Sequence, residues 1–180
     1  ERTMKFEAEG RVKSADLTTV YEIIRDRLPE LVPFMDNVSA IETVERRDGP
    51  SGPHLLNRWR ADAGQVPAAA RKIIKPEMLE WLDSADWNDA EHHVDWKIES
   101  AVFKGMYTCT GRNRVVVDGD DVRIVISGDM AVDPKRIPGL PGFLAKKVVP
   151  VVEGYLIERM KPNMASLGLG VQRFLAAGKS

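Results

Sequence analysis

Hydrophobic and polar positions alternate along much of the chain, and this period-two pattern predicts strands. The clearest case is the range 121–132, where every second residue from Val122 to Val132 is apolar or glycine. Weaker alternation predicts strands over residues 4–13, 38–47, 54–62, 77–83, 91–100 and 105–117. Turn sequences at 48–53 and at Asp118-Gly119 predict two hairpins.

Apolar residues return at helical spacing in two places. Leu17 to Leu28 follows a capping sequence at Ser14-Ala15-Asp16, and Pro29 and Pro33 end that helix or confine its continuation to a short second one. A second helix is predicted over residues 142–161, with Pro150 kinking it or marking its true start. The apolar stretch from Leu167 to Leu175 can extend this helix beyond Pro162.

The predicted order is strand, helix, at least five antiparallel strands and a long C-terminal helix. Hairpin-connected strands with helices at the ends predict an α+β fold, built as one domain over residues 1–180. A long helix laid across a curved antiparallel sheet leaves a space between them. That space is either filled with side chains or kept open for a ligand.

Charge and cysteine content narrow the function classes. The chain has 26 basic and 27 acidic residues, for a net charge of −1, which argues against a nucleic-acid binder that works through overall charge. The single cysteine, Cys109, excludes an intramolecular disulfide and a multi-cysteine metal site. No apolar run is long enough to span a bilayer, and residues 1–5 do not resemble a signal peptide. We therefore expect a reduced, cytoplasmic protein.

The element order and the length of the chain resemble the helix-grip superfamily, which includes START lipid-transfer domains, pollen-allergen-like proteins and aromatic polyketide cyclases. The resemblance covers nearly the whole chain and rests on no signature motif. It implies a curved antiparallel β-sheet that grips the C-terminal α-helix, with a hydrophobic cavity for a lipid or another hydrophobic small molecule. A narrower likeness, to PRELI-type phosphatidic-acid carriers, rests on His54–Arg60, the basic apolar loop that follows, Glu80 and Val94-Asp95-Trp96.

Polar residues at inward strand positions are candidates for the cavity wall, because a buried polar group must bind either its neighbours or a ligand head group. These residues are Asn57, Glu80, His92, Tyr107 and Asn113. Trp59 and Trp96 are the preferred aromatic pair, because their faces also carry aliphatic residues. The full set of predicted ligand-binding residues is Leu55, Asn57, Trp59, Glu80, His92, Trp96, Ile98, Tyr107, Cys109, Ile126, Met130, Val148 and Tyr155.

Two segments, 64–75 and 134–149, concentrate positive charge. Together they carry seven basic residues and no acidic one, so the rest of the chain carries a net charge of −8. Basic residues beside apolar ones are typical of a rim that touches an anionic membrane transiently. The predicted membrane-contact residues are Arg71, Lys72, Ile73, Ile74, Ile137, Leu140, Phe143, Lys146 and Lys147. The alternative is that the apolar residues belong to the core and the lysines form a solvated face.

The sequence contains few motifs that are typical of catalytic or metal-binding sites. No metal-ligand spacing and no Gly-x-Ser-x-Gly elbow occurs, so we expect no metal, no cofactor and no catalytic residue. Asp118, Asp120 and Asp121 fit a solvated turn better than a calcium site. Cys109 fits a small buried hydrophobe better than a nucleophile.

These sequence features favour three alternative functions. The first is a lipid or hydrophobic-ligand binder that carries its ligand to or from membranes. The second is a cyclase or dehydratase using His92 with Tyr107 or Glu80 as acid and base. The third is a partner-binding module that uses the region of Leu167-Gly168-Leu169.

Overall fold

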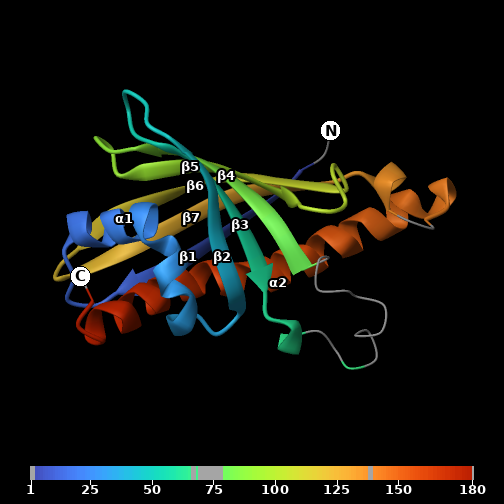
Figure 1. The fold of residues 1–180 in the computed structure, drawn as a ribbon. Coiled ribbons are helices and arrows are strands. Elements are labelled where there is room, and N and C mark those ends of the chain that lie inside the picture. The colour runs from blue at the N-terminus through green and yellow to red at the C-terminus, as the bar shows by residue number, and fades with distance from the viewer. Residues whose placement is uncertain (1–2, 66–67, 69–78, 138–139, 180) are drawn as a thin grey trace.

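The computed structural model describes residues 3–65, 68, 79–137 and 140–179. Its strands are β1 (Met4–Val12), β2 (Val38–Arg47), β3 (His54–Ala61), β4 (Glu80–Asn88), β5 (His93–Ser100), β6 (Tyr107–Asp118) and β7 (Asp121–Val132). Its α-helices are α1 (Leu17–Asp26) and α2 (Ala145–Ala176). Short 3-10 helices are η1 (Leu28–Phe34), η2 (Ala63–Gln65), η4 (Pro134–Arg136) and η5 (Gly142–Leu144). Figure 1 shows the long helix α2 running beneath the strands.

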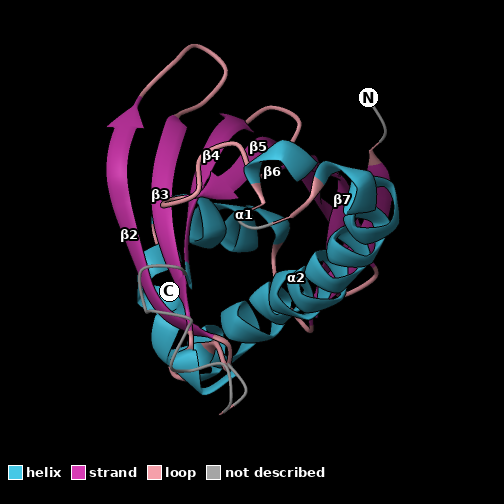
Figure 2. Ribbon diagram, turned by 90° about the vertical axis from the view of Figure 1, so that its right-hand side faces the viewer, coloured by secondary structure: helices cyan, strands magenta, loops and turns pink. Residues whose placement is uncertain are grey.

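The strands form one antiparallel sheet in the order β1-β7-β6-β5-β4-β3-β2. Figure 2 shows this sheet curving round, with α1 within the curve and α2 running along the side formed by β7. The helix α2 packs on β1 and β7. The predicted α+β class, with a curved antiparallel sheet and a long C-terminal helix, is therefore confirmed.

The first helix begins where the sequence predicts. Asp16 is its N-cap, and its carboxylate accepts a 3.0 Å hydrogen bond from Thr19 N. The buried face of α1 consists of Val20, Tyr21, Ile23 and Ile24. The 3-10 helix η1 then carries Pro29 and Pro33, so the short second helix expected after Leu28 is present.

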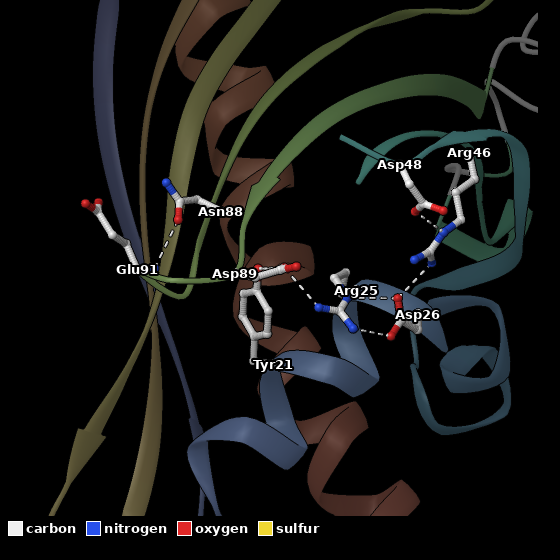
Figure 3. A network of polar contacts seen from close by, with 8 residues as sticks. All are labelled: Tyr21, Arg25, Asp26, Arg46, Asp48, Asn88, Asp89 and Glu91. Atoms are coloured by element: carbon white, nitrogen blue, oxygen red, sulfur yellow. Dashed lines mark hydrogen bonds and ion pairs between the residues drawn. The ribbon is translucent and has the colours of Figure 1, made fainter. Parts of the chain in front are cut away.

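Polar and charged side chains tie α1 to the β4–β5 turn and to the end of β2, as Figure 3 shows. Arg25 is bonded to Asp26 at 2.6 Å and to Asp89 at 2.9 Å, and the Tyr21 hydroxyl also donates to Asp89 at 2.7 Å. Arg46 of β2 reaches Asp26 at 2.8 Å. The Arg25 guanidinium holds the pKa of Asp26 below its ordinary value. This network fastens α1 across one end of the curved sheet.

The long helix α2 continues through both of its prolines, Pro150 and Pro162. Pro150 does not mark the helix start, because α2 begins at Ala145, and the extension beyond Pro162 is confirmed. A close approach to the sheet occurs at Gly168, where an added Cβ would lie 2.8 Å from Arg11 N. Among the described helices, none is both long enough and apolar enough to cross a membrane.

Several predicted strand boundaries are wrong. The range 77–83 ends five residues too early, because β4 runs to Asn88. The predicted strand 91–100 begins at His93, because His92 has a φ of 53° and lies in the turn before β5. The tight β6–β7 hairpin is confirmed, and Gly119 in its loop has a φ of 62°.

Candidate functional site

The candidate site is built from inward-facing residues of neighbouring strands. Trp59 of β3 lies opposite Trp81 of β4, and Asp83 lies opposite both Asn57 and Ile98. Residues that lie directly opposite one another in an antiparallel pair point to the same face of the sheet. This face also carries Leu55, Ala85 and Trp87, which are buried in the core. Trp59, Trp81 and Asp83 therefore lie on the inner, concave face.

The inner face is packed unevenly from one end to the other. Toward α1, its side chains are buried against the helix and η1. Toward the chain end of β3 and the start of β4, the inner side chains stay partly exposed. These partly exposed residues are Trp59, Trp81, Asp83, Ile98 and Tyr107. Their rings and aliphatic groups form a surface that the described residues do not fully cover.

The helix α2 contributes a stripe of apolar side chains. Leu156, Met160 and Met164 are partly buried and pack against the core. Glu153 is an acidic residue that the sequence analysis missed, and it is only 2% exposed. It precedes the buried Ile157 by one helical turn, so its side chain starts from the inward face of the helix.

Two of the polar candidates satisfy their hydrogen bonds inside the fold. Asn57 Oδ1 accepts a 2.8 Å hydrogen bond from the Thr43 hydroxyl. Asn113 Oδ1 accepts a 2.7 Å hydrogen bond from the indole N–H of Trp96. For these two side chains, mutual satisfaction is the observed outcome, and a ligand is not needed to explain either of them.

Asp83 is a second inward polar residue that the sequence analysis missed. Its Oδ1 and the indole Nε1 of Trp59 are both shielded from solvent, and neither has a hydrogen-bond partner of normal geometry among the described residues. Burial raises the pKa of Asp83 to about 7, and the nearby Trp59 N–H offsets part of that rise. The signal was present in the sequence, because Trp81, Asp83, Ala85 and Trp87 alternate, but the predicted strand stopped at residue 83.

The other predicted lining residues fall into two groups. Leu55, Trp96, Cys109, Ile126 and Met130 are all buried core residues on or near the inner face. Trp59, Ile98 and Tyr107 are partly exposed on it, and burial raises the pKa of Tyr107 to about 12. Val148 lies partly exposed near the start of α2, and Tyr155 lies in the same helix but its side chain is outside the described part.

The structure does not bring Glu80 and His92 to the same place. Glu80 is paired across the strands with Arg60 and bonds to its guanidinium, on the face opposite to Trp59 and Trp81. The ring of His92 makes an edge contact with Tyr21 of α1, with centroids 5.1 Å apart. His92 lies in the turn before β5 with a positive φ, and the Tyr21 ring that it contacts is buried and also packs on Trp87 of the inner face.

The outer face holds a serine, a histidine and an aspartate in a row. His54 Nδ1 lies 2.7 Å from Asp86 Oδ1, and its Nε2 lies 3.4 Å from the Ser84 hydroxyl. The Asp86 side chain is 76% exposed, so the carboxylate is solvated rather than held in a closed site. This long Ser–His contact on an open strand surface is best explained as surface hydrogen bonding.

The predicted basic rim is described only in its second half. Arg71, Lys72, Ile73 and Ile74 lie outside the described residues. Phe143 in η5 is 82% exposed, and Lys146 and Lys147 at the start of α2 are exposed beside it. Ile137 and Leu140 are partly buried. A single exposed phenyl ring beside two lysines also occurs on ordinary solvated faces, so the membrane contact stays a prediction.

Metal chemistry has no support in the described part of the chain. No group of three His, Cys, Asp or Glu residues in it is arranged to hold a metal ion. At the β6–β7 turn, Arg11 bonds to Asp118 at 2.7 Å and to Asp121 at 2.9 Å. The charge of both carboxylates is therefore balanced by the Arg11 guanidinium.

The partner-binding alternative fits the structure poorly. Leu167 is buried, and Gly168 lies against the backbone of β1. Only Leu169 of that trio is notably exposed, at 41%. This stretch therefore serves mainly to dock α2 on the sheet.

Comparison with known proteins identifies the fold. No family model and no curated protein matches the sequence. Solved structures do match. A protein from Thermus thermophilus is 22% identical, with a TM-score of 0.62 over 98% of this chain and 100% of the other. The Zhui aromatase/cyclase from a Streptomyces species is 18% identical, with a TM-score of 0.61 over 99% of this chain and 100% of its own.

A START superfamily protein from Mycobacterium smegmatis is 14% identical, with a TM-score of 0.58 over 95% of this chain and 98% of the other. The protein therefore has the helix-grip fold, as the resemblance implied. At these identities the likeness concerns the fold, and the site has to be interpreted from its own residues.

Proposed function

We propose that the protein binds a hydrophobic small molecule between the inner face of the sheet and α2. The observation that carries this proposal is the row of partly exposed side chains on a concave face, with Trp59, Trp81, Ile98 and Tyr107 at its centre. Large apolar groups left partly uncovered on an inner face lose burial that a ligand of similar character would restore. The similarity of the fold to an aromatase/cyclase and to a START superfamily protein supports this proposal.

Carriage of a lipid to or from membranes is the finer form of the proposal. An acyl chain that leaves a bilayer exposes about 0.8 kcal/mol per methylene, or about 12 kcal/mol for a chain of about 16 carbons. A dry binding surface at the membrane removes most of that barrier. The exposed Phe143 with Lys146 and Lys147 would provide transient contact with an anionic leaflet.

The test is to identify what the purified protein holds. Native mass spectrometry and solvent extraction should show a bound hydrophobic molecule. Mixing with vesicles should load an emptied protein faster from phosphatidylserine-rich membranes than from neutral ones. An empty protein that takes up nothing from either kind of vesicle would show that the proposal is wrong.

A second candidate function, a cyclase or dehydratase on a hydrophobic substrate, is favoured by one observation. Asp83 faces inward with a pKa of about 7, which suits a general acid or base near neutral pH. Incubation with a short poly-β-ketone separates the two functions. Recovery of a cyclised product supports catalysis, whereas return of the unchanged molecule supports binding alone.

A further inference from the structure

Two orphaned polar atoms lie close together in the candidate site. Trp59 and Asp83 are diagonal neighbours on β3 and β4, because Trp59 pairs with Trp81 and Asp83 pairs with Asn57. Trp59 Nε1 and Asp83 Oδ1 are both shielded from solvent, and beyond the Trp59 N–H lying near the Asp83 carboxyl, neither has a hydrogen-bond partner of normal geometry among the described residues. A shielded polar atom without a partner is costly, so the pair is poised to accept a partner from outside the chain.

The surroundings of the pair are apolar on the sides that the structure describes. Trp59 and Trp81 stack with ring centroids 5.7 Å apart and an interplanar angle of 18°. Ile98 lies opposite Asp83 on β5. A molecule seated on these side chains would therefore be apolar over most of its surface and polar at one point.

The hydrogen-bonding capacity of the two atoms restricts which polar group the ligand can carry. An indole N–H can only donate a hydrogen bond, so the ligand group must contain an acceptor. An ammonium group has donors only, so it would leave Trp59 unpaired. A hydroxyl both accepts and donates, and it can therefore satisfy Trp59 and Asp83 together.

A hydroxyl also fits both protonation forms of Asp83. Since burial raises the pKa of Asp83 to about 7, the neutral and ionised forms coexist near neutral pH. A ligand carbonyl is an acceptor only, so it could bond to Asp83 only while the carboxyl holds its proton. A hydroxyl donates to the ionised form and can accept from the neutral one.

We propose that Trp59 Nε1 and Asp83 Oδ1 form the polar anchor of the site, and that the ligand is an apolar molecule with a free hydroxyl group. This inference rests on the proposed function, since it names the chemical class that the same site prefers. It assigns Asp83 a binding role and needs no covalent step.

The experiment compares matched probes by equilibrium dialysis on the full chain. The probes are decanol, decyl methyl ether, a decanone and decylammonium, with naphthol and methoxynaphthalene as an aromatic pair. Each alcohol should bind roughly ten- to a hundredfold more tightly than its ether, because the ether leaves Asp83 without a donor. The ketone and the ammonium should bind more weakly than the alcohol.

Variants then locate the preference. Trp59→Phe and Asp83→Leu should each lower the alcohol-to-ether ratio toward one while the ether still binds. Trp87→Phe is the matched control, because it removes another shielded indole N–H of β4 that packs on Tyr21 of α1, away from the anchor. It should keep the ratio of the unmodified protein.

The possible results distinguish failure of the proposed function from failure of the polar anchor. If no probe of either series binds the unmodified protein, the proposed function itself is overturned. If ether and alcohol bind equally well, hydrophobic binding stands and the anchor is wrong. Tighter binding of the ketone or the ammonium than of the alcohol would also overturn the hydroxyl assignment. These three results need only the unmodified protein, so a variant that fails to fold does not obscure them.

Discussion

Gly168 of α2 rests directly on Gly10 of β1. A Cβ added to Gly168 would stand 3.0 Å from Gly10 Cα and 2.8 Å from Arg11 N. Both groups are backbone, so neither can swing aside as a flexible side chain would. This contact sets how closely the long helix approaches the sheet, and with it the distance between the inner face and the stripe of Leu156, Met160 and Met164.

The first prediction follows from this contact. Gly168→Ala should lower the free energy of unfolding by about 1–3 kcal/mol, because the helix must move away from β1 to admit the methyl group. Gly154→Ala is the matched control, since Gly154 lies in the same helix with open space around its Cβ position. It should raise stability by about 0.5–1 kcal/mol through helix propensity. Urea unfolding measures both, and equal effects of the two variants would contradict the close contact.

The second prediction concerns the pH dependence of stability. Burial raises the pKa of Asp83 from 3.8 to about 7, so the folded protein binds this proton more tightly than the unfolded chain does. The carboxyl is neutral in both states well below pH 4, and it destabilises the fold increasingly as the pH rises toward 7. Asp83→Asn should therefore stabilise the protein at pH 8 by about 2–3 kcal/mol more than at pH 5.

The control for that prediction is Asp120→Asn, which removes an exposed carboxyl from the β6–β7 turn. Its effect on the free energy of unfolding should be nearly the same at the two pH values. A flat difference between Asp83→Asn and the unmodified protein across this range would show that Asp83 is solvated in the folded state.

The third prediction tests the exposed rim. Lys146→Glu combined with Lys147→Glu should weaken binding to phosphatidylserine vesicles by about thirtyfold or more, since each basic residue near such a surface contributes about 1 kcal/mol. The same change at Lys13 and Lys97, two exposed lysines elsewhere on the molecule, should have a much smaller effect. Vesicle sedimentation gives the comparison. A similar loss in both double variants would indicate a response to net charge rather than a docking surface.

The fourth prediction concerns Cys109. Its side chain has no exposed surface, and burial raises the pKa of the thiol to about 12. We expect the folded protein to resist a thiol-reactive disulfide reagent at pH 8 and to react fully in urea. Rapid labelling of the native protein would mean that the inner face opens far more often than its packing indicates.

The sequence predicts the well-packed parts of this fold better than the site. The alternation from Val122 to Val132 marks β7 clearly, because its alternate side chains fill the core. In β4 the inward residues include Asp83 and Ala85, a polar and a small side chain, so hydrophobic periodicity fails where the candidate site begins. At Pro150 the sequence left open whether the proline kinks the helix or begins it, and only the structure excludes the second alternative, because α2 begins at Ala145.

The site residues also divide into those that strand parity places correctly and those that it does not. Trp59 and Ile98 were correctly placed inward by strand parity, whereas His92 lies in a turn outside β5, where parity does not apply, and its ring contacts Tyr21 of α1. The expected inward position of Glu80 was also wrong. Glu80 belongs to the same strand as Trp81 and points the opposite way, where Arg60 provides a cation. Asp83 was missed because the predicted strand ended at residue 83, before the buried Ala85 and Trp87 that mark its face as inward.

The uneven packing of the inner face has a consequence for how the folded protein fluctuates. Backbone amides under α1 and the Arg25 network should exchange with solvent only through global unfolding, whereas those of β4 beside Trp81 and of the first half of α2 should exchange through smaller local openings. A bound molecule would slow exchange selectively in the second group. Deuterium uptake, followed peptide by peptide, would thus map occupancy of the site before its ligand is identified.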